Sequence, residues 1–374
     1  MRQSIAFWLS RLTTTALLFA ACSGNEAVSP TPPPALGDAV LRSTGAFGYS
    51  ATPLPLPHAA PGACSTAYWP CYDYGVAADI NDAGAIAGWV LDYGNGNQLG
   101  KHATKWVGNT PTMLPHPLRV WWTAATAISP LGEVVGWGSR VGGIEHVPIK
   151  WTAGGTPIVL PLAGGPYSGS GEAHDINASG LVVGNDFVGG LPRAVKWQNG
   201  TMVIIAPPGT SQSAARSVNR HGDIAGWIAQ PSGSATAYVW KANGTQFALQ
   251  LPGSYAYGIS DNGVVVGFVG QNAFLWSTTT GTQLLNWGPS VGRAVSYFDR
   301  VVGHSYGTGA GTPYNAFTHR AGLDETLQDP ASGQPNYGAE ALGVNACGSI
   351  VGSFHEGLYK RPVIWTKARC DVMR

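Results

Sequence analysis

The sequence predicts an all-β fold, a seven-bladed β-propeller of four-stranded antiparallel blades. Three observations lead to this prediction: a pattern that occurs seven times, a hairpin-turn motif inside each copy, and an apolar strand ending in an aromatic residue or a histidine after each hairpin. Repeats of about 40–50 residues with four short strands each are typical of propellers. The expected domain spans residues 51–370.

One glycine marks the repeat. It is Gly88 in the first copy, and the aligned glycines are Gly88, Gly136, Gly184, Gly226, Gly267, Gly303 and Gly352. Seven residues before each glycine stands an Asn or Ser, and three residues further on stands a Gly, or Asp299 in the sixth copy. An Asn or Ser side chain opens a type I turn, and Gly or Asp accepts the positive φ that closes it. Hairpins are therefore expected near 76–90, 124–138, 172–186, 214–228, 255–269, 293–305 and 340–354.

A third and a fourth strand follow each hairpin. The third strands end at Trp106, Trp151, Trp197, Trp240, Trp276, His319 and Trp365. The fourth strands are expected at 111–115, 157–161, 202–206, 247–251, 283–287 and 325–329, which leaves the last repeat without one. Residues 51–57 are expected to supply it and close the ring, because an outermost strand tolerates their alternating prolines.

The repeat resembles the HAF repeat family of extracellular proteins, named for its His-Ala-Phe motif. The family pattern matches Ala78–Gly88 and, most closely, Asn272–Trp276 and Asn315–Phe317, and the resemblance covers about residues 75–366. It implies an extracellular repeat fold of the propeller type. It brings no established activity or catalytic residues to this sequence.

Composition excludes some partners. Charged residues make up 11% of the 374 residues and the net charge is +1, so neither nucleic acid nor an anionic membrane surface is an expected partner. The sequence has no nucleophile elbow, P-loop or dinucleotide motif, and no cofactor is expected. We expect a monomer.

The N-terminus predicts export. Residues 1–21 read as a signal peptide, and Phe19–Cys22 resembles a bacterial lipobox with Cys22 as the acylated residue. An ordinary signal peptide is the alternative. Residues 22–50, rich in Pro, Ser and Ala, read as a tether. The expected location is the bacterial outer membrane or cell surface as a lipoprotein, and otherwise the periplasm or the exterior.

Four further cysteines are Cys64, Cys71, Cys347 and Cys370, and three pairings are open. Cys347 falls in the last blade's first hairpin turn and Cys370 after its third strand, which places both on one face. Cys64 and Cys71 fall in the connection to the first blade, on the opposite face. The expected pairs are therefore Cys347–Cys370 and Cys64–Cys71.

Two classes of function stay open. Aromatic residues outside the repeat register, expected on the face with the long loops, suit a carbohydrate, peptide or protein ligand; they are Trp69, Trp121, Trp122, Tyr93 and Tyr167. Packing of these rings within their own loops is the alternative. Histidines near that face (His102, His146, His174, His304 and His355) show no metal or catalytic spacing, so neither site is expected. A binding module is therefore favoured over a propeller lyase or hydrolase acting at the channel mouth, which a convergence of His, Tyr and a carboxylate would favour.

Overall fold

The computed structural model describes residues 48–57, 74–94, 98–140, 145–163, 169–231, 233–285, 287–306, 315–328, 330, 338–356 and 359–371. The chain divides into Met1–Ala39 and Val40–Arg374, and all described residues belong to the second unit. The expected signal peptide and the predictions for Cys22, Cys64, Cys71, Trp69 and Tyr167 lie outside the described residues. Within the described part, no helix is long and apolar enough to cross a membrane.

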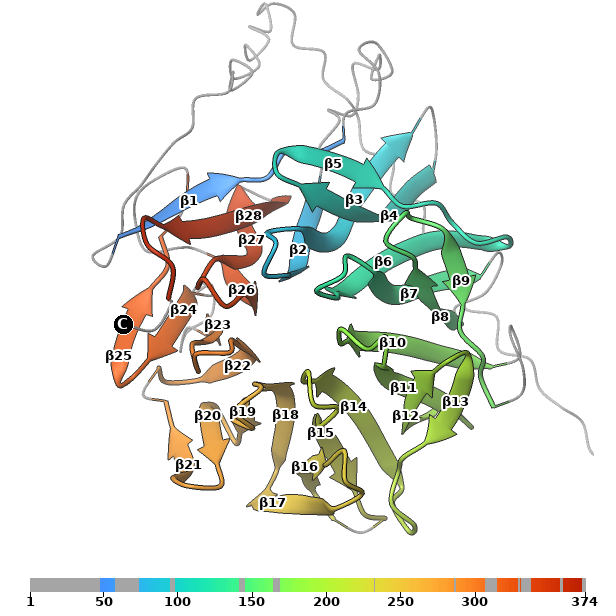
Figure 1. The fold of residues 1–374 in the computed structure, drawn as a ribbon, viewed down its shortest axis with the longest axis vertical. Helices are drawn as coiled ribbons and strands as arrows, with labels where there is room; N and C mark the ends of the chain where they lie inside the picture. Colours follow the sequence, from blue (N-terminus) through green and yellow to red (C-terminus); the bar gives the residue numbers. More distant parts are fainter. Residues whose placement is uncertain are drawn as a thin grey trace, which may run out of the picture. The chain divides into compact units, whose positions relative to one another are not determined.

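Seven four-stranded antiparallel sheets form a ring, as predicted (Figure 1). Blade 1 contains β2 (Tyr74–Ile80), β3 (Ile86–Gly94), β4 (Gln98–Val107) and β5 (Thr110–Met113); blade 2 contains β6 (Val120–Ile128), β7 (Val134–Arg140), β8 (His146–Trp151) and β9 (Pro157–Val159); blade 3 contains β10 (Ser170–Ile176), β11 (Val182–Val188), β12 (Leu191–Gln198) and β13 (Thr201–Ile204). Blade 4 contains β14 (Gln212–Val218), β15 (Ile224–Ala229), β16 (Ala235–Trp240) and β17 (Gln246–Pro252); blade 5 contains β18 (Ser254–Ile259), β19 (Val265–Val269), β20 (Asn272–Ser277) and β21 (Gly281–Leu284); blade 6 contains β22 (Ser290–Val295), β23 (Val301–Ser305), β24 (Asn315–Arg320) and β25 (Leu323–Thr326).

Blade 7 combines both ends of the propeller, as predicted. Its sheet has the order β1-β28-β27-β26, formed by β1 (Tyr49–Pro53), β28 (Tyr359–Lys367), β27 (Ile350–Glu356) and β26 (Glu340–Val344). The strand begins at Tyr49 rather than at residue 51 and ends at Pro53. Leu54 and Leu56, which follow it, are buried in the core of blade 1. The segment thus belongs to two blades at once.

The tryptophans that end the third strands join neighbouring blades. Trp106, Trp151, Trp197 and Trp365 are fully buried, and the indole Nε1 of each donates to a carbonyl at the outer end of the preceding blade. The acceptor is the carbonyl of Pro55, Pro115, Pro161 or Gln328, at 2.6–2.8 Å. The Leu-Pro pairs that follow the outer strands therefore attach each blade to the next one. Leu114 and Leu160 are buried, and the carbonyls of the prolines after them accept these hydrogen bonds.

The first hairpin of each blade has the predicted turn. Asn81 N and Ala85 O are 3.0 Å apart, Gly84 has φ 81° and Asp299 has φ 58°. The asparagines also join the blades to one another, because Asn81 Nδ2 donates to Ser129 O and Asn345 Nδ2 donates to Asn81 O, at 3.0 and 3.2 Å. One side chain thus shapes its own turn and holds the next one.

The repeat glycines are required by close contact between backbones. Each pairs with the innermost strand at a β-bulge, where the register shifts by one residue; in blade 4 the shift lies between Ala215 and Ser217, opposite Gly226. A Cβ atom built on any of the seven glycines would lie 1.8–2.0 Å from a carbonyl oxygen of that strand. A side chain therefore cannot fit at these seven positions. The bulge beside each glycine leaves one residue of the inner strand unpaired.

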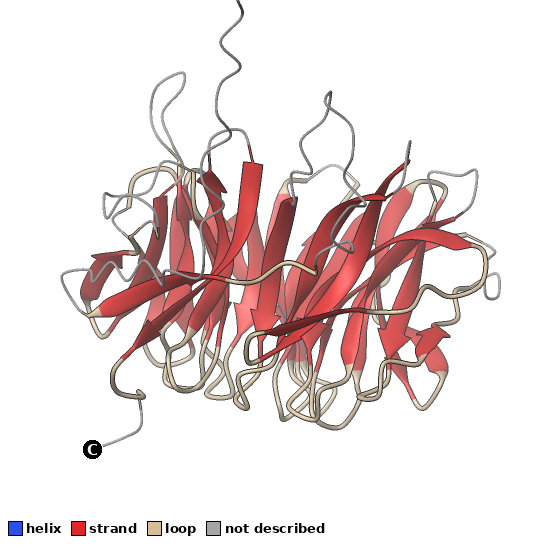
Figure 2. Cartoon of the chain, turned by 90° about the horizontal axis from the view of Figure 1, so that it is seen from above, coloured by secondary structure: helices blue, strands red, loops and turns tan. Residues whose placement is uncertain are grey.

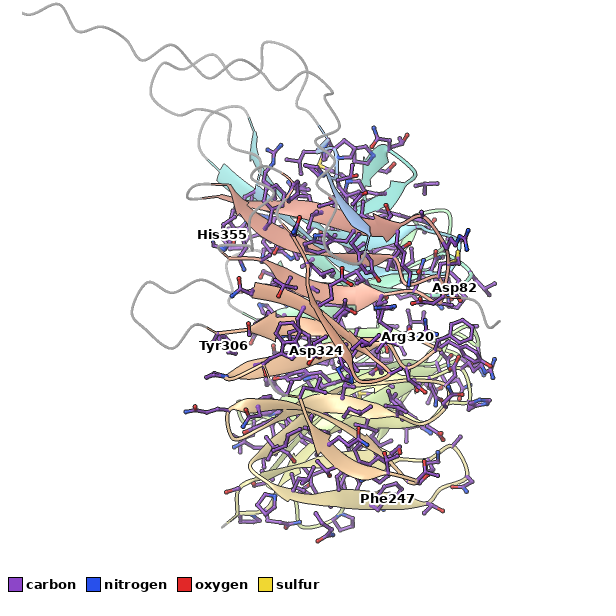
Figure 3. All side chains as sticks on the ribbon, turned by 90° about the vertical axis from the view of Figure 1, so that its left-hand side faces the viewer. Asp82, Phe247, Tyr306, Arg320, Asp324 and His355 are labelled. Atoms are coloured by element: carbon purple, nitrogen blue, oxygen red, sulfur yellow. A yellow bond between two sulfur atoms is a disulfide. The ribbon has the colours of Figure 1, made fainter. Side chains whose placement is uncertain are left out.

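The propeller has two different faces. The hairpin turns between the first and second strands lie on one face, here called the turn face, and the connections between second and third strands lie on the other, here called the loop face (Figure 2). Asp82 marks the turn face, whereas Tyr306 and His355 mark the loop face (Figure 3).

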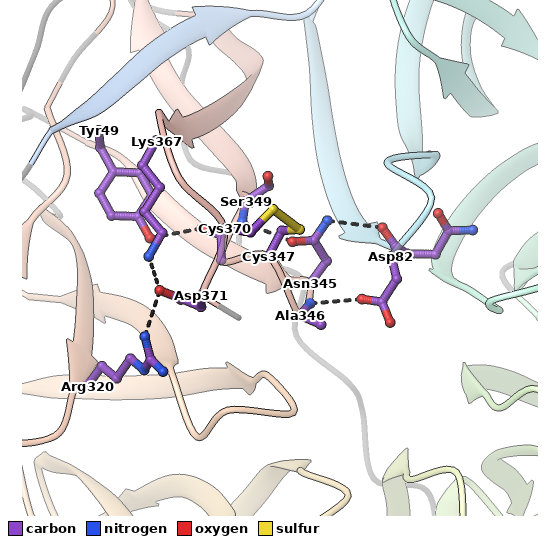
Figure 4. Close-up of a disulfide and its surroundings, with 12 residues drawn as sticks. Tyr49, Asp82, Arg320, Asn345, Ala346, Cys347, Ser349, Lys367, Cys370 and Asp371 are labelled. Carbon is purple, nitrogen blue, oxygen red and sulfur yellow. Dashed lines mark hydrogen bonds and ion pairs between the residues drawn. A yellow bond between two sulfur atoms is a disulfide. The ribbon is translucent and has the colours of Figure 1, made fainter. Parts of the chain in front are cut away.

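A disulfide and an ion-pair cluster fix the end of blade 7 (Figure 4). Cys347 and Cys370 form the predicted disulfide. The adjacent Asp371 accepts hydrogen bonds from Arg300 Nε at 2.6 Å, from Arg320 Nη1 at 2.7 Å and from Lys367. Because Arg300 and Arg320 belong to blade 6, this carboxylate joins the last two blades.

Candidate functional site

Seven bulged residues of the innermost strands form a ring inside the central channel. They stand ten residues before the repeat glycines, one in each blade, and are Ala78, Thr126, His174, Arg216, Tyr257, Arg293 and Leu342. With the hairpin turns below them they line a cavity of about 330 Å³ that reaches the turn face. This set is called the channel ring.

The titratable members of the channel ring are contiguous and come from blades 3 to 6. His174 Nε2 lies 2.5 Å from Asn185 Oδ1 and 3.2 Å from Arg216 Nη1. The Cζ atoms of Arg216 and Arg293 lie 5.9 and 4.9 Å from the centroid of the same Tyr257 ring. Two guanidinium groups therefore lie near one phenol ring, within the range of cation–π attraction.

A chain of side chains leads from His174 toward the loop face. Glu172 Oε1 lies 2.7 Å from His146 Nδ1, and Glu172 Oε2 lies 3.9 Å from His174 Nε2. Trp137 stacks on His146 with ring centroids 4.0 Å apart. Burial lowers the pKa of His174 to about 4, and the charge of Arg216 contributes to the shift. His174 is therefore neutral at pH 7.

A second pocket opens on the loop face between blades 5 and 6 and is here called the blade 5–6 pocket. It has a volume of about 570 Å³, and Tyr257 and Arg293 line both this pocket and the channel cavity. Phe268 lies between two tyrosines in a stack, with its centroid 5.0 Å from Tyr255 and 6.0 Å from Tyr257. Aromatic faces and a guanidinium group therefore meet in one hollow.

Two carboxylates next to the channel ring hold the inner strands together. Asp79 Oδ2 accepts from Ile128 N at 2.9 Å, and Asp175 Oδ2 accepts from Val218 N at 2.8 Å, in each case from the next blade. Burial raises the pKa of Asp175 to about 7, and the charge of Asp79 adds to the shift. These are structural groups that resist ionisation.

Replacing Asp175 with asparagine is expected to change the pH dependence of stability. An unfolded aspartate has a pKa of about 3.9, so the folded protein holds this proton more tightly than the unfolded chain, and the wild type loses stability as pH rises from about 4 through 7. The asparagine side chain carries no charge at any pH. Urea unfolding at pH 5 and at pH 8 measures how far the free energy of unfolding falls between these two pH values. This fall should be smaller in D175N than in the wild type by about 1 kcal/mol or more. E145Q, at an exposed position, should follow the wild type, and parallel wild-type and D175N profiles would contradict the prediction.

Of the ligand-binding residues predicted from the sequence, Trp121 and Trp122 are described in full. They begin the innermost strand of blade 2 on the loop face, and they are 47% and 46% exposed. Successive strand residues normally point to opposite sides, but the register shifts between Val120 and Trp122, and this bulge leaves both rings in solvent. The backbone of Tyr93 lies in β3.

The structure brings together several histidines that the sequence leaves unconnected. His146 and His174 meet through Glu172, and His304 Nε2 lies 3.0 Å from Tyr306 Oη. Among the described residues, no three His, Cys, Asp or Glu side chains are placed to hold a metal ion.

The channel ring was not predicted from the sequence, although its signal is present there. The position ten residues before each repeat glycine is polar or aromatic in blades 3 to 6.

The fold and the ring place this chain in the class of seven-bladed β-propellers. Comparison with protein-family models gives no match, and comparison with curated proteins gives none. The chain is similar to the structure of prolyl oligopeptidase B from Galerina marginata, with a TM-score of 0.53, 8% identity, and coverage of 79% of this chain and 49% of that one. TolB from Acinetobacter baumannii is also similar, with a TM-score of 0.42, 13% identity, and coverage of 66% of this chain and 64% of that one. The chain thus spans about half to two thirds of these proteins, and at such identities the similarity shows the fold alone.

Proposed function

We propose that this propeller is an exported, surface-tethered binding module that takes a saccharide on its loop face. The observation that carries the proposal is the pair Trp121 and Trp122, two adjacent indole rings that are about half exposed at the inner edge of that face. Large exposed rings stack on sugar rings without needing charge, and adjacent exposed apolar residues mark interaction surfaces. Peptide and protein ligands are the other outcomes of the test below.

Export and tethering are supported by independent features. The repeats resemble the HAF family of extracellular proteins, to which we assign the chain as part of the proposal. The Cys347–Cys370 disulfide suits an oxidising compartment. Residues 1–21 and Cys22 read as an export signal with a lipid attachment site.

The double variant W121A/W122A tests the binding site. We expect it to lose binding in a screen of glycans and cell-wall fragments while its melting temperature stays within about 2 °C of the wild type, because exposed side chains contribute little to stability. L131A, which removes an exposed leucine on the turn face, is the matched control and should bind as the wild type does. A large fall in melting temperature with unchanged binding would mean that the two rings pack rather than bind.

A second function, a lyase or hydrolase acting on polysaccharide or peptide, is favoured by one observation. His174, Arg216 and Tyr257 line the channel cavity, Glu172 joins His174 to His146, and neutral His174 is in the protonation state of a general base. Mass spectrometry of ligands incubated with the protein tests this function. Ligands that stay intact after prolonged incubation would contradict the enzymatic function and support binding without catalysis.

A further inference from the structure

Arg216 and Arg293 are the two arginines of the channel ring, and in the described residues no carboxylate lies within ion-pair distance of either guanidinium. Arg193 and Arg300, in contrast, each pair with an aspartate, at 2.9 and 2.6 Å. The hydrogen-bond partner of Arg216 is neutral His174, at 3.2 Å. The Nε atoms of Arg216 and Arg293 are both buried without an acceptor. Two positive charges therefore stand in the channel wall without a direct ion pair, and Glu172 acts on Arg216 only from beyond ion-pair distance.

This arrangement is unfavourable for the protein alone. Burial lowers the pKa of Arg216, Tyr257 and the Glu172 carboxylate oppose this shift in part, and the positive charge of Arg293 adds to it. A charge taken from water without a partner weakens the fold, and such strain is typically retained where a ligand supplies the missing charge. Both arginines line the channel cavity, and an anion held there by both would compensate the two charges, since guanidinium groups bind carboxylates through paired hydrogen bonds.

The surroundings indicate what the anion is attached to. The blade 5–6 pocket joins Arg293 and Tyr257 to Phe268 and Tyr306, and none of its lining residues is acidic. The channel cavity, which both arginines line, also contains Asp79, Asp82, Asp175 and Asp261, of which Asp79 and Asp175 are bonded to backbone amides. Flat aromatic faces pack against the C–H faces of a sugar ring, while a guanidinium takes a carboxylate on the same ring. The volume of the blade 5–6 pocket, about 570 Å³, lies within the range of small-molecule sites, about 300–1,000 Å³.

We propose that Arg216 and Arg293 form a carboxylate site in the channel ring, and that the ligand of this module is an acidic saccharide built from uronate residues. The inference rests on the proposed function for the saccharide class. It adds the charge of the ligand and a position for it, with the sugar ring against Tyr257 and Phe268 and the carboxylate between the two arginines.

The test compares tetragalacturonic acid with its methyl ester, a neutral cello-oligosaccharide and a glutamate-rich peptide, by calorimetry on the whole exported chain. The wild type is expected to bind the free acid at least tenfold more tightly than the ester. R216Q and R293Q should weaken binding of the free acid about ten- to a hundredfold, as expected for loss of a charge-assisted hydrogen bond, and leave the ester unchanged. R369Q, at an exposed arginine that lines neither the channel cavity nor the blade 5–6 pocket, is the matched control and should bind as the wild type does.

Thermal unfolding of the same variants distinguishes a ligand site from a structural role. If Arg216 is an uncompensated charge, R216Q melts at the same temperature as the wild type or above it. A lower melting temperature together with unchanged binding of the free acid would overturn the proposal.

The remaining outcomes separate this inference from the function on which it rests. Equal affinity for acid and ester, preference for the peptide, or no saccharide binding at all would each overturn the carboxylate site. Binding of the neutral saccharide that W121A/W122A abolishes and R216Q preserves would leave the proposed function standing without this inference. Loss of free-acid binding in R216Q but not in W121A/W122A would support the carboxylate site and place the saccharide in the channel rather than on the tryptophans.

Discussion

Replacing Gly226 with alanine is expected to lower the free energy of unfolding by about 3 kcal/mol or more. The added Cβ atom would lie 2.0 Å from Ala214 O, 3.0 Å from Ala214 C and 3.1 Å from Ala215 Cα. All three are backbone atoms of the bulged inner strand, so no side-chain rotation relieves the overlap. The two inner strands of blade 4 would have to separate, which would also displace Arg216 at the bulge.

Chemical denaturation of G226A and wild type measures this loss. G154A is the matched control: Gly154 lies in an exposed turn, the nearest atom that an added Cβ would meet is Thr152 Oγ1 at 4.0 Å, and its φ is not positive. That variant should stay within about 0.5 kcal/mol of the wild type. A G226A protein as stable as G154A would show that the bulge yields, and that the repeated glycine is not required by packing.

The double variant C347A/C370A is expected to lose about 3 kcal/mol of stability. The two cysteines are 23 residues apart, and closing a loop of this length in the unfolded chain contributes roughly that amount in the chain-entropy description. The loss includes a local part, because Cys370 holds Asp371 beside Arg300 and Arg320 of blade 6.

Unfolding in the presence and absence of a reductant checks this expectation. The wild type should become as unstable as the variant when reduced, whereas the reductant should leave the variant unchanged. A variant as stable as the oxidised wild type would show that the ion-pair cluster alone holds the end of blade 7.

The sequence predicts the architecture well because its landmarks act locally. Asn81 and Gly84 shape one turn, and Trp106 is the penultimate residue of one strand, so each could be interpreted without knowing the rest of the chain. The closing strand followed from counting, since one repeat lacked an outer strand.

The site was not predictable in the same way. A bulge is a mismatch between two strands, and it displaces Arg216 and Tyr257 toward the channel only once both strands are paired. The contact between His146 and Glu172 joins two blades, and nothing in the spacing of those residues indicates it. The exposure of both Trp121 and Trp122 likewise depends on a register shift.

The shared sheet of blade 7 also bears on how the ring assembles. Tyr49 donates from its hydroxyl to Gly348 O, a partner 299 residues away in the sequence, whereas the other six blades are each built from one continuous segment. Contacts of such long range carry a large loop-closure entropy, and topologies rich in them fold slowly. The outer place beside β28 is filled only when the two ends of the propeller meet, and we therefore expect β1 to pair after the continuous blades have formed.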